Sequence, residues 1–434
     1  MIDEIIKEAE EHVKKYAEEY EIYLNQNHIL ELTSQNNDLS FAKEEIMLGL
    51  GIRVLYEDKM GFAYTTDMNK LENTAQNAYS NAKLNQADKN FSFAEKSKYP
   101  KIDNNIDEKN KDLDLDEITS FMKNMINIAN DNNCNPTSGE FSKSYDEEIL
   151  INSNGVEVKD KNTYFGAYIA VNAIENNELS SAYDTIYSRK YDELNGDELA
   201  NNVSKLAKDS IGGVKVDTKD TNVILDYHAA IGILSTFMQG FSGDNVVRGR
   251  SMLKDKVGET IVSEDLSIYD DGIYSGGLNS CKFDSEGTAS QKTNLVKNGV
   301  LEGFIYDIYN GNKANEKSTG NGFRSFNSTP SISYSNLIFD FDDKKDINNI
   351  KEGVLATDVL GAHTANPITG DFSLEVSNGF IIKDGEYDNP IKKAMISGNV
   401  YSMLKECEAI KSEIKQYGPF ILPKIVLPNL RVIG

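Results

Sequence analysis

The sequence has 434 residues, of which 39% are hydrophobic and 26% are charged, so it is long enough for two or three domains and has a globular composition. Lys and Arg number 45 against 69 Asp and Glu, and the resulting net charge of −24 repels phosphate backbones and anionic lipids. These values exclude a disordered chain, a general nucleic-acid binder and a membrane-surface binder as the expected class.

The cysteines and the N-terminus indicate the compartment. Cys134, Cys281 and Cys407 form no CxxC pair, which is typical of buried or free thiols in a reducing environment. The first residues carry acids where a secretory signal needs basic ones, and no apolar run approaches the 18 residues that a membrane span requires. We therefore expect a cytoplasmic protein.

The N-terminal half predicts an antiparallel sheet with helices. Apolar residues from Ile2 to Tyr20 follow a three-and-four spacing, which predicts an amphipathic helix, and alternation from Ile22 predicts a half-buried strand. Two hairpins are expected because β-prone runs flank short turn segments. The predicted elements after Ile22 are hairpins at 46–66 and 148–159, helices at 71–82, 115–129 and 197–210, a polar surface connection at 86–112, and a further strand at 164–171.

A turn-rich, charged segment near Gly213 marks the predicted domain boundary. It separates an N-terminal α+β domain, residues 1–213, from a C-terminal β-rich domain, residues 214–434, so the fold class is α+β. In the second domain we expect a strand at 222–227, a helix at 229–239, short β-prone runs to about 386, and a closing helix at 391–411. The three prolines of the tail predict an extended segment or an edge strand, because proline cannot donate to a ladder.

The usual hydrolase signatures are absent from the sequence. There is no HExxH or HExxxH to hold zinc, no GxSxG to present a nucleophilic serine, and no GxxxxGK[ST] to bind phosphates. Of the four histidines, we interpret His12 as a solvated helix residue and His28 as a half-buried strand residue. The glycines at 49 and 51 do not continue into a dinucleotide motif, and we interpret them as relieving crowding or marking a bulge.

Weaker constellations supply the candidate site residues. His363 lies in a Gly-bounded loop with Asn366 and Asp371, and loops of this make-up often line binding sites. Arg324 follows two glycines and could meet a carboxylate or simply belong to a tight loop. Asp270 and its neighbour Asp271 favour a turn over a metal site, because adjacent side chains of an extended segment point to opposite faces. The basic run at 242–259 is expected to be a solvated surface.

Read in order, the segments of this chain resemble the TldD/PmbA family, and the likeness covers nearly the whole length. The N-terminal segments that carry it are GLGIRVL, GFAYTTD and INSNGVEV. More specific is a linked C-terminal set, which comprises residues 242–272, residues 283–307, the motif STGNGFR, and residues 363–386 with HTANPITGDFSLEVSNGF.

Within that family the chain is similar to the PmbA branch, also called TldE, rather than to the TldD branch. The TldD branch resembles a zinc peptidase with HExxxH on a helix and a distant Cys as third ligand. At the corresponding helix this chain has Ser-Thr-Phe-Met-Gln at residues 235–239, while His228 stands alone before it. Cys407 lies outside the TGDFS region, so it is not carried over as a ligand.

The resemblance implies a non-catalytic subunit of a metallopeptidase complex that acts on unfolded peptides, with no cofactor in this chain and zinc in a TldD-type partner. It also implies that a homodimer could form when the partner is missing. Substrate-contact candidates would be His363, Asn366, Asp371 and Arg324. Two alternatives stay open: a regulatory binding protein, as the family name "modulator of DNA gyrase" implies, and an autonomous hydrolase with an unidentified site.

Overall fold

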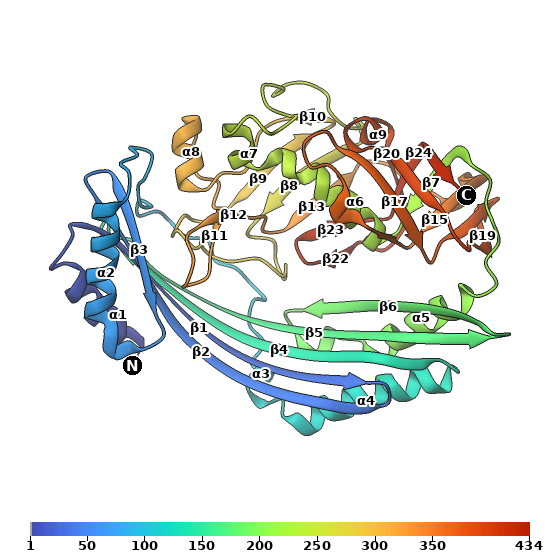
Figure 1. Cartoon of the computed structure of the whole chain (residues 1–434), viewed down its shortest axis with the longest axis horizontal. Helices are drawn as coiled ribbons and strands as arrows, with labels where there is room; N and C mark the ends of the chain where they lie inside the picture. Colours follow the sequence, from blue (N-terminus) through green and yellow to red (C-terminus); the bar gives the residue numbers. More distant parts are fainter. Residues whose placement is uncertain (1) are drawn as a thin grey trace.

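The computed structural model describes residues 2–434, and its N-terminal half is built on one long, curved, antiparallel sheet (Figure 1). The strand order is β3-β2-β1-β4-β5-β6, and every neighbouring pair is antiparallel, which confirms the predicted sheet. The strands are β1 (Glu19–Gln35), β2 (Asp38–Tyr56), β3 (Lys59–Thr65), β4 (Asn135–Asn152), β5 (Glu157–Glu175) and β6 (Glu178–Ser188). Both predicted hairpins are confirmed as β2-β3 and β4-β5.

Helices cover one face of this sheet because alternate strand residues on that face are apolar. Leu32, Phe141 and Phe165 point to that side and pack against helices of the central region. The helices are α1 (Ile2–Val13), α2 (Leu71–Leu84), α3 (Lys109–Asp112), α4 (Leu115–Asp131) and α5 (Gly196–Asp209). In Figure 1, α4 and α5 lie along the outer side of the curve, and the C-terminal half lies opposite its inner side.

Three N-terminal expectations need correction. The first helix ends at Val13, before Tyr20, because Tyr20 already belongs to β1 and its hydroxyl reaches back to Glu10. The expected separate strand at 164–171 is the middle of β5, since the pairing with β4 continues without a turn. The connection at 86–112 is more than a surface segment, because it buries Phe93 and Ala94.

The C-terminal half is β-rich, as predicted, and contains two larger sheets around a buried helix, α6 (Tyr227–Met238). The first sheet has the order β10-β9-β8-β13-β23-β22, and the second contains β16-β17-β20-β24-β7-β15-β18-β19. The helices besides α6 are α7 (Gly243–Val247), α8 (Ile308–Ala314) and α9 (Val400–Met403). The strands are β7 (Lys219–Leu225), β8 (Leu266–Asp271), β9 (Lys292–Lys297), β10 (Val300–Leu301), β11 (Gly322–Phe323), β12 (Ser331–Ile332), β13 (Leu337–Phe341), β14 (Lys344–Lys345), β15 (Glu352–Ala356), β16 (Asp358–Leu360), β17 (Asp371–Ser377), β18 (Phe380–Lys383), β19 (Glu386–Pro390), β20 (Met395–Asn399), β21 (Glu408–Ile410), β22 (Lys415–Tyr417), β23 (Phe420–Leu422) and β24 (Ile425–Ile433).

The predicted closing helix at 391–411 is wrong. The segment forms β20, the single-turn α9 and β21, and Gly398 in β20 lies tightly against Leu430 of β24, where a bulkier residue would clash. Val400 and Leu404 are buried in the sheet core, so their helix-like spacing reflects one local turn only. The tail is extended, as expected, but β24 lies inside the sheet between β20 and β7.

The central position of β24 is compatible with its proline because the pairing with β7 skips that residue. The register shifts between Leu427 and Leu430, and Asn429 has a positive φ of 55°. Because of this irregularity, Pro428 is not paired with β7, so the N–H that proline lacks is not needed in the ladder.

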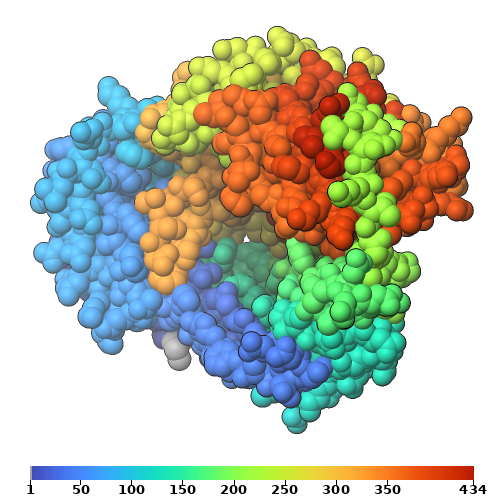
Figure 2. Space-filling view, turned by 45° about the vertical axis from the view of Figure 1, so that its right-hand side comes forward, coloured from blue at the N-terminus to red at the C-terminus, as the bar shows by residue number. Residues whose placement is uncertain are grey.

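The apolar junction of the two halves lies at one end of the N-terminal sheet, and polar contacts of β6, such as that between Asp184 and His228, join them a second time. Tyr23 and Leu150 of that sheet form a buried cluster with Phe283 and Phe326 of the C-terminal half. Gly49 lies against the Phe326 ring, and a Cβ atom there would come within 2.3 Å of it, so the crowding interpretation of this glycine is confirmed. Elsewhere the molecule is hollowed between the halves, as Figure 2 shows.

Two further predictions concern the thiols and membrane spans. All three cysteines are free and buried, as the sequence indicated. Within residues 2–434, no helix combines the length and the hydrophobicity needed to cross a bilayer.

Candidate functional site

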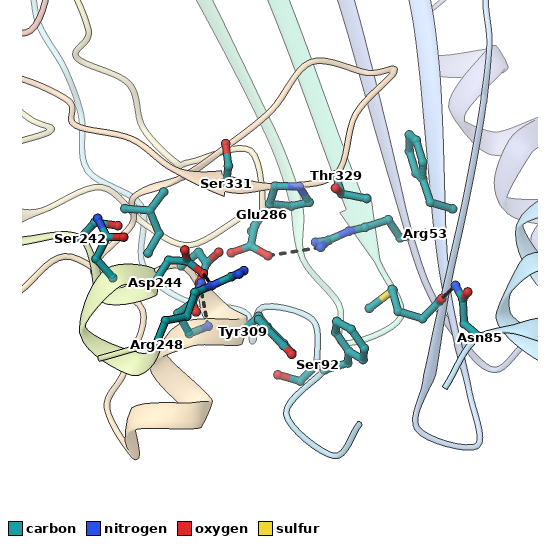
Figure 3. A pocket seen from close by; sticks show the side chains of 18 of the residues that line it. Arg53, Asn85, Ser92, Ser242, Asp244, Arg248, Glu286, Tyr309, Thr329 and Ser331 are labelled. Carbon is teal, nitrogen blue, oxygen red and sulfur yellow. Dashed lines mark hydrogen bonds and ion pairs between the residues drawn. The ribbon is translucent and has the colours of Figure 1, made fainter. Parts of the chain in front are cut away.

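A cavity of about 610 Å³ lies where the N-terminal sheet meets α7, α8 and the 329–332 loop (Figure 3). This volume is within the range of ligand sites in proteins. Its apolar wall comes from β3, the 85–92 segment and α8. The residues of that wall are Met60, Phe62, Phe91 and Tyr309, and the rings of the last two stack 4.7 Å apart.

A buried ion-pair cluster forms the floor of this cleft. Arg53 of β2 donates from Nε and Nη2 to the carboxylate of Glu21 on β1, both at 2.8 Å, and from Nη1 to Glu286 at 3.2 Å. Arg324 also pairs with Glu21. Because all four side chains are nearly inaccessible, each charge depends on its partners for stability.

Electrostatics on this floor follow from burial. Burial opposes the charge of Arg53, but Glu21 and Glu286 outweigh that effect and raise the pKa of Arg53 above its ordinary value. Burial lowers the pKa of Arg324 to about 10. The pKa values of Glu286 and Asp307 are raised, again mainly by burial. On this floor, the two arginines balance the charges of Glu21 and Glu286. The floor is therefore a structural ion-pair cluster, and its carboxylates are not free to act as acids.

The polar wall comes from the chain just after α6. Gln239, Ser242 and Asp244 line the cavity, and the Asp244 carboxylate accepts from Nε of Arg248 at 2.8 Å. Thr329 and Ser331 face them from the opposite loop (Figure 3). Part of the basic run at 242–259 thus forms a wall of the cleft. The sequence analysis expected a solvated surface there and therefore missed Arg248 as a cleft residue. This arrangement can bind extended polar groups by hydrogen bonds.

The residues present do not fit a zinc ion. Ser235 on α6 and Gln239 directly after it are not zinc-binding side chains, and His228 at the start of α6 pairs with Asp184 of β6 at 2.8 Å. Cys407 is completely buried in the core. Among residues 2–434, no group of three or more His, Cys, Asp or Glu side chains is arranged to hold a metal ion.

The structure separates the predicted site residues into two places. Arg324 lies in the buried cluster and meets the carboxylate of Glu21, which is one of the two roles considered for it. His363 lies in an exposed turn, in the same loop as Asn366, whose backbone N–H donates to the Asp371 carbonyl. The Asp371 side chain accepts from Thr369 and Asn399, so it is held within the loop.

The turn interpretation of Asp270 is wrong, because Asp270 lies within strand β8, which ends at Asp271, and pairs with Leu337 of β13. Its side chain is 2% exposed and accepts hydrogen bonds from Asn321 and Ser335. Burial raises the pKa of Asp270 to about 7. These contacts make it a structural anchor between loops of the C-terminal half.

The sequence reasoning also missed a second cavity, of about 930 Å³, between β6, α5 and the C-terminal half. His228 and Tyr417 both contact Asp184 there, and Lys424 pairs with Asp226 at 2.9 Å. The partners lie far apart in sequence, so no local pattern could have joined them. Because these charges are already paired with one another, the cavity presents fewer free groups than its size suggests.

Comparisons with known proteins cover nearly the whole chain. Models described as PmbA/TldA metallopeptidase domain 1, central domain and C-terminal domain match residues 20–82, 108–211 and 218–434. An uncharacterized protein of Methanocaldococcus jannaschii is 38% identical over 88% of each chain, and the metalloprotease PmbA homolog of Haemophilus influenzae is 25% identical over 89% of this chain and 85% of its own.

Two solved structures also match the fold over nearly the whole length of this chain. TldE from Thermococcus kodakarensis has a TM-score of 0.93 at 25% identity, covering 99% of this chain and 100% of that one. A putative modulator of a DNA gyrase from Thermotoga maritima has a TM-score of 0.91 at 24% identity, with complete coverage of both chains, and shows the shared fold.

Proposed function

Because the chain belongs to the TldD/PmbA metallopeptidase family, we propose that it is the TldE-type subunit of a two-component metallopeptidase whose zinc lies in a TldD-type partner. In this proposal the chain supplies a wall of the cleft that presents an unfolded peptide to the partner's zinc. It carries no cofactor of its own.

The observation that carries the proposal is a cleft beside a helix whose described residues form no metal-binding group. The chain after α6 opens into the cavity, yet its residues are Gln239, Ser242 and Asp244, which are suited to hydrogen bonding rather than to holding zinc. A subunit of this kind contributes by positioning, because holding a peptide in register raises the rate of a reaction whose chemistry lies elsewhere.

Free hydrogen-bonding groups on both walls support a peptide as the ligand. Among the described residues, the hydroxyls of Ser242, Thr329 and Ser331 make no hydrogen bonds, so they are available to backbone amides of a bound chain. The stacked rings of Phe91 and Tyr309 provide apolar contact for side chains. This combination is typical of sites that bind peptides with little sequence selectivity.

The experiment is reconstitution with a TldD-type subunit from the same source. We expect the two chains to co-purify and to hydrolyse an unfolded peptide that neither chain cleaves alone, with the activity lost on chelation. The double variant T329V/S331A should reduce turnover about 10-fold by loss of positioning. The control S402A removes a hydroxyl from the exposed turn at α9, away from the cleft, and should leave turnover unchanged.

Other outcomes would select the alternatives. Chelator-insensitive peptidase activity of the isolated chain would indicate an autonomous hydrolase. Salt-sensitive binding to gyrase without any TldD-type subunit would favour a regulatory protein. A stable homodimer that never exchanges with the partner would also contradict the proposal.

His363 is a second candidate for peptide contact within this proposal. Its loop is exposed and reaches α6, because Ala362 lies opposite Gly232 of that helix. His363→Ala should leave the thermal midpoint nearly unchanged and reduce turnover of the reconstituted complex by roughly 100-fold if the side chain positions peptide. A lowered midpoint with an unchanged rate would assign His363 a structural role only.

A further inference from the structure

The inner face of the N-terminal sheet is open at the end away from the junction. On this face, alternate residues of β1, β2, β4, β5 and β6 point toward the C-terminal half, opposite the side that α4 and α5 cover (Figure 1). Side chains here are partly or fully exposed, and Phe41 and Tyr187 are 58% and 36% exposed. Tyr183 marks the border of this surface, because its hydroxyl donates to Asp358 of β16. We call this surface, formed by Asn27, Ile29, Glu31 and Thr33 of β1 and their cross-strand neighbours, the open face.

Carboxylates on the open face lack cationic partners. Glu31 of β1 lies opposite Ser142 of β4, and Glu140 of β4 lies one row away, opposite Thr33. Neither Glu31, Glu140 nor Asp146 forms an ion pair with the described residues. The lysine of this face, Lys43, is already paired with Glu45. Among the described residues, Glu31 and Glu140 therefore have neither an ion-pair nor a hydrogen-bond partner, whereas the Asp146 carboxylate accepts hydrogen bonds only from the neutral side chains of Asn27 and Ser144.

Tyrosine rings lie directly beside these acids. Tyr168 of β5 is the cross-strand neighbour of Glu140, and its ring is 6.2 Å from that of Tyr183 on β6. Tyr164 and Tyr187 form a second pair with centroids 5.5 Å apart. Aromatic faces next to carboxylates are the surroundings that stabilise ammonium and guanidinium groups.

From this juxtaposition we infer that the open face binds extended peptide segments rich in Lys and Arg. Residues i and i+2 of an extended peptide point to the same side about 7 Å apart, which is the row spacing that separates Glu140 from Glu31 on the sheet. Charge complementarity thus selects a basic segment. The inference rests on the proposed function in taking an unfolded peptide as the ligand, and it adds a preference that the cleft does not provide.

Binding of a basic peptide could come from the net charge of the whole protein or from the acids of the open face, and the experiment must separate the two. The protein as a whole has a net charge of −24 and attracts any basic peptide weakly. A local site, in contrast, depends on the open-face acids themselves. A control must therefore remove the same number of charges from the helix-covered side of the sheet.

The test is fluorescence anisotropy with labelled ten-residue peptides, a Lys-Thr repeat, a Glu-Thr repeat and a Ser-Thr repeat, on the isolated full chain without partner or zinc. We expect the Lys-Thr peptide to bind best, and the triple variant E31Q/E140Q/D146N to weaken its binding by about 10-fold. The matched control E11Q/E117Q/D131N changes the same charge on α1 and α4 and should weaken binding by less than about 2-fold.

Two more variants keep the inference testable if the triple variant does not fold. Ser142→Lys places a cation opposite Glu31 at a partly exposed position and should also abolish the preference for the basic peptide. Tyr168→Leu retains the charges but removes one ring, so it should weaken binding by about 3-fold.

Three results would overturn the inference. Equal losses in the open-face and control triple variants would assign binding to the overall field. Equal binding of the three peptides would remove the preference. Sedimentation that shows a wild-type dimer, dissolved by the open-face variants, would make the face a contact between two copies. Each leaves the reconstituted peptidase assay unaffected, whereas an inactive complex with intact Lys-Thr binding would reject only the proposed function.

Discussion

The two ends of the N-terminal sheet use the same strands for opposite purposes. At the junction with the C-terminal half, Glu21 and Arg53 are buried and paired with each other. At the far end of the sheet, Glu31 of β1 and Glu140 of β4 are partly exposed and form no ion pair with the described residues. Acidic residues of one sheet are therefore structural where a cation compensates them and available to a ligand where none does.

This comparison predicts its largest effect at the junction. Arg53→Ala would leave Glu21 and Glu286 buried with one cation fewer, so the free energy of unfolding should fall by about 3–5 kcal/mol. Urea denaturation of the full chain measures it. The control Arg431→Ala breaks an exposed pair with Asp220 and should cost less than about 1 kcal/mol. Similar small losses for both arginines would show that the junction is not held by its charges.

The next effect comes from packing at the same junction. Gly49→Ala would place a Cβ atom 2.3 Å from the Phe326 ring, and this overpacking should lower the free energy of unfolding by about 1–3 kcal/mol. Gly303→Ala, at an open position, should stay within about 0.5 kcal/mol. If the double variant G49A/F326L is no more stable than G49A, the contact between these two residues is not the cause.

The free energy of unfolding should also depend on pH through Glu148 of β4. Burial raises the pKa of Glu148 to about 7, and Asp146 and Asp160 add to the shift. A raised pKa means that the folded state holds a proton that the unfolded chain releases near pH 4.3. Stability from this group is therefore complete below about pH 4.3 and is lost as the pH rises toward 7, at up to about 1.4 kcal/mol per pH unit.

Glu148→Gln should flatten that slope in thermal midpoints measured from pH 4 to pH 8. The control Glu157→Gln, exposed on the same hairpin, should retain the wild-type slope. An unchanged slope in the Glu148 variant would place the origin of the pH dependence elsewhere.

The smallest effect belongs to the open face. Burial and the neighbouring charge of Glu31 raise the pKa of Glu140, so its charged form is disfavoured in the folded protein. Glu140→Gln should therefore leave the free energy of unfolding unchanged or raise it by about 0.5 kcal/mol in urea denaturation. A clear loss of stability would instead show that Glu140 is a structural residue like Glu21.

The sequence predicted the features that depend on local pattern. The β4-β5 hairpin and helices α2, α4 and α5 followed from periodicity and turn residues, and the β-rich C-terminal half followed from its short strands. The spacing of Val400 and Leu404 misled because one helical turn between two strands has the same local period as a longer helix. In this segment, pairing with strands that are distant in sequence determines the structure, not the local period.

The candidate cleft was largely beyond prediction because its residues come from distant segments. Arg53 pairs with Glu286, which lies 233 residues away in sequence, and no periodicity connects them. Arg324 was identified as able to meet a carboxylate, but the identity of that carboxylate depends on how the two halves pack. The sequence itself showed the absence of HExxxH, whereas the cleft beside α6 was visible only in the structure.

In the proposed complex, this chain shapes the cleft while its partner holds the metal. Native mass spectrometry of the reconstituted pair, after zinc loading and removal of free metal, tests it directly. We expect one zinc per pair, which stays with the TldD-type subunit when the pair is dissociated, and none on this chain. One tightly bound zinc on this chain alone would contradict it.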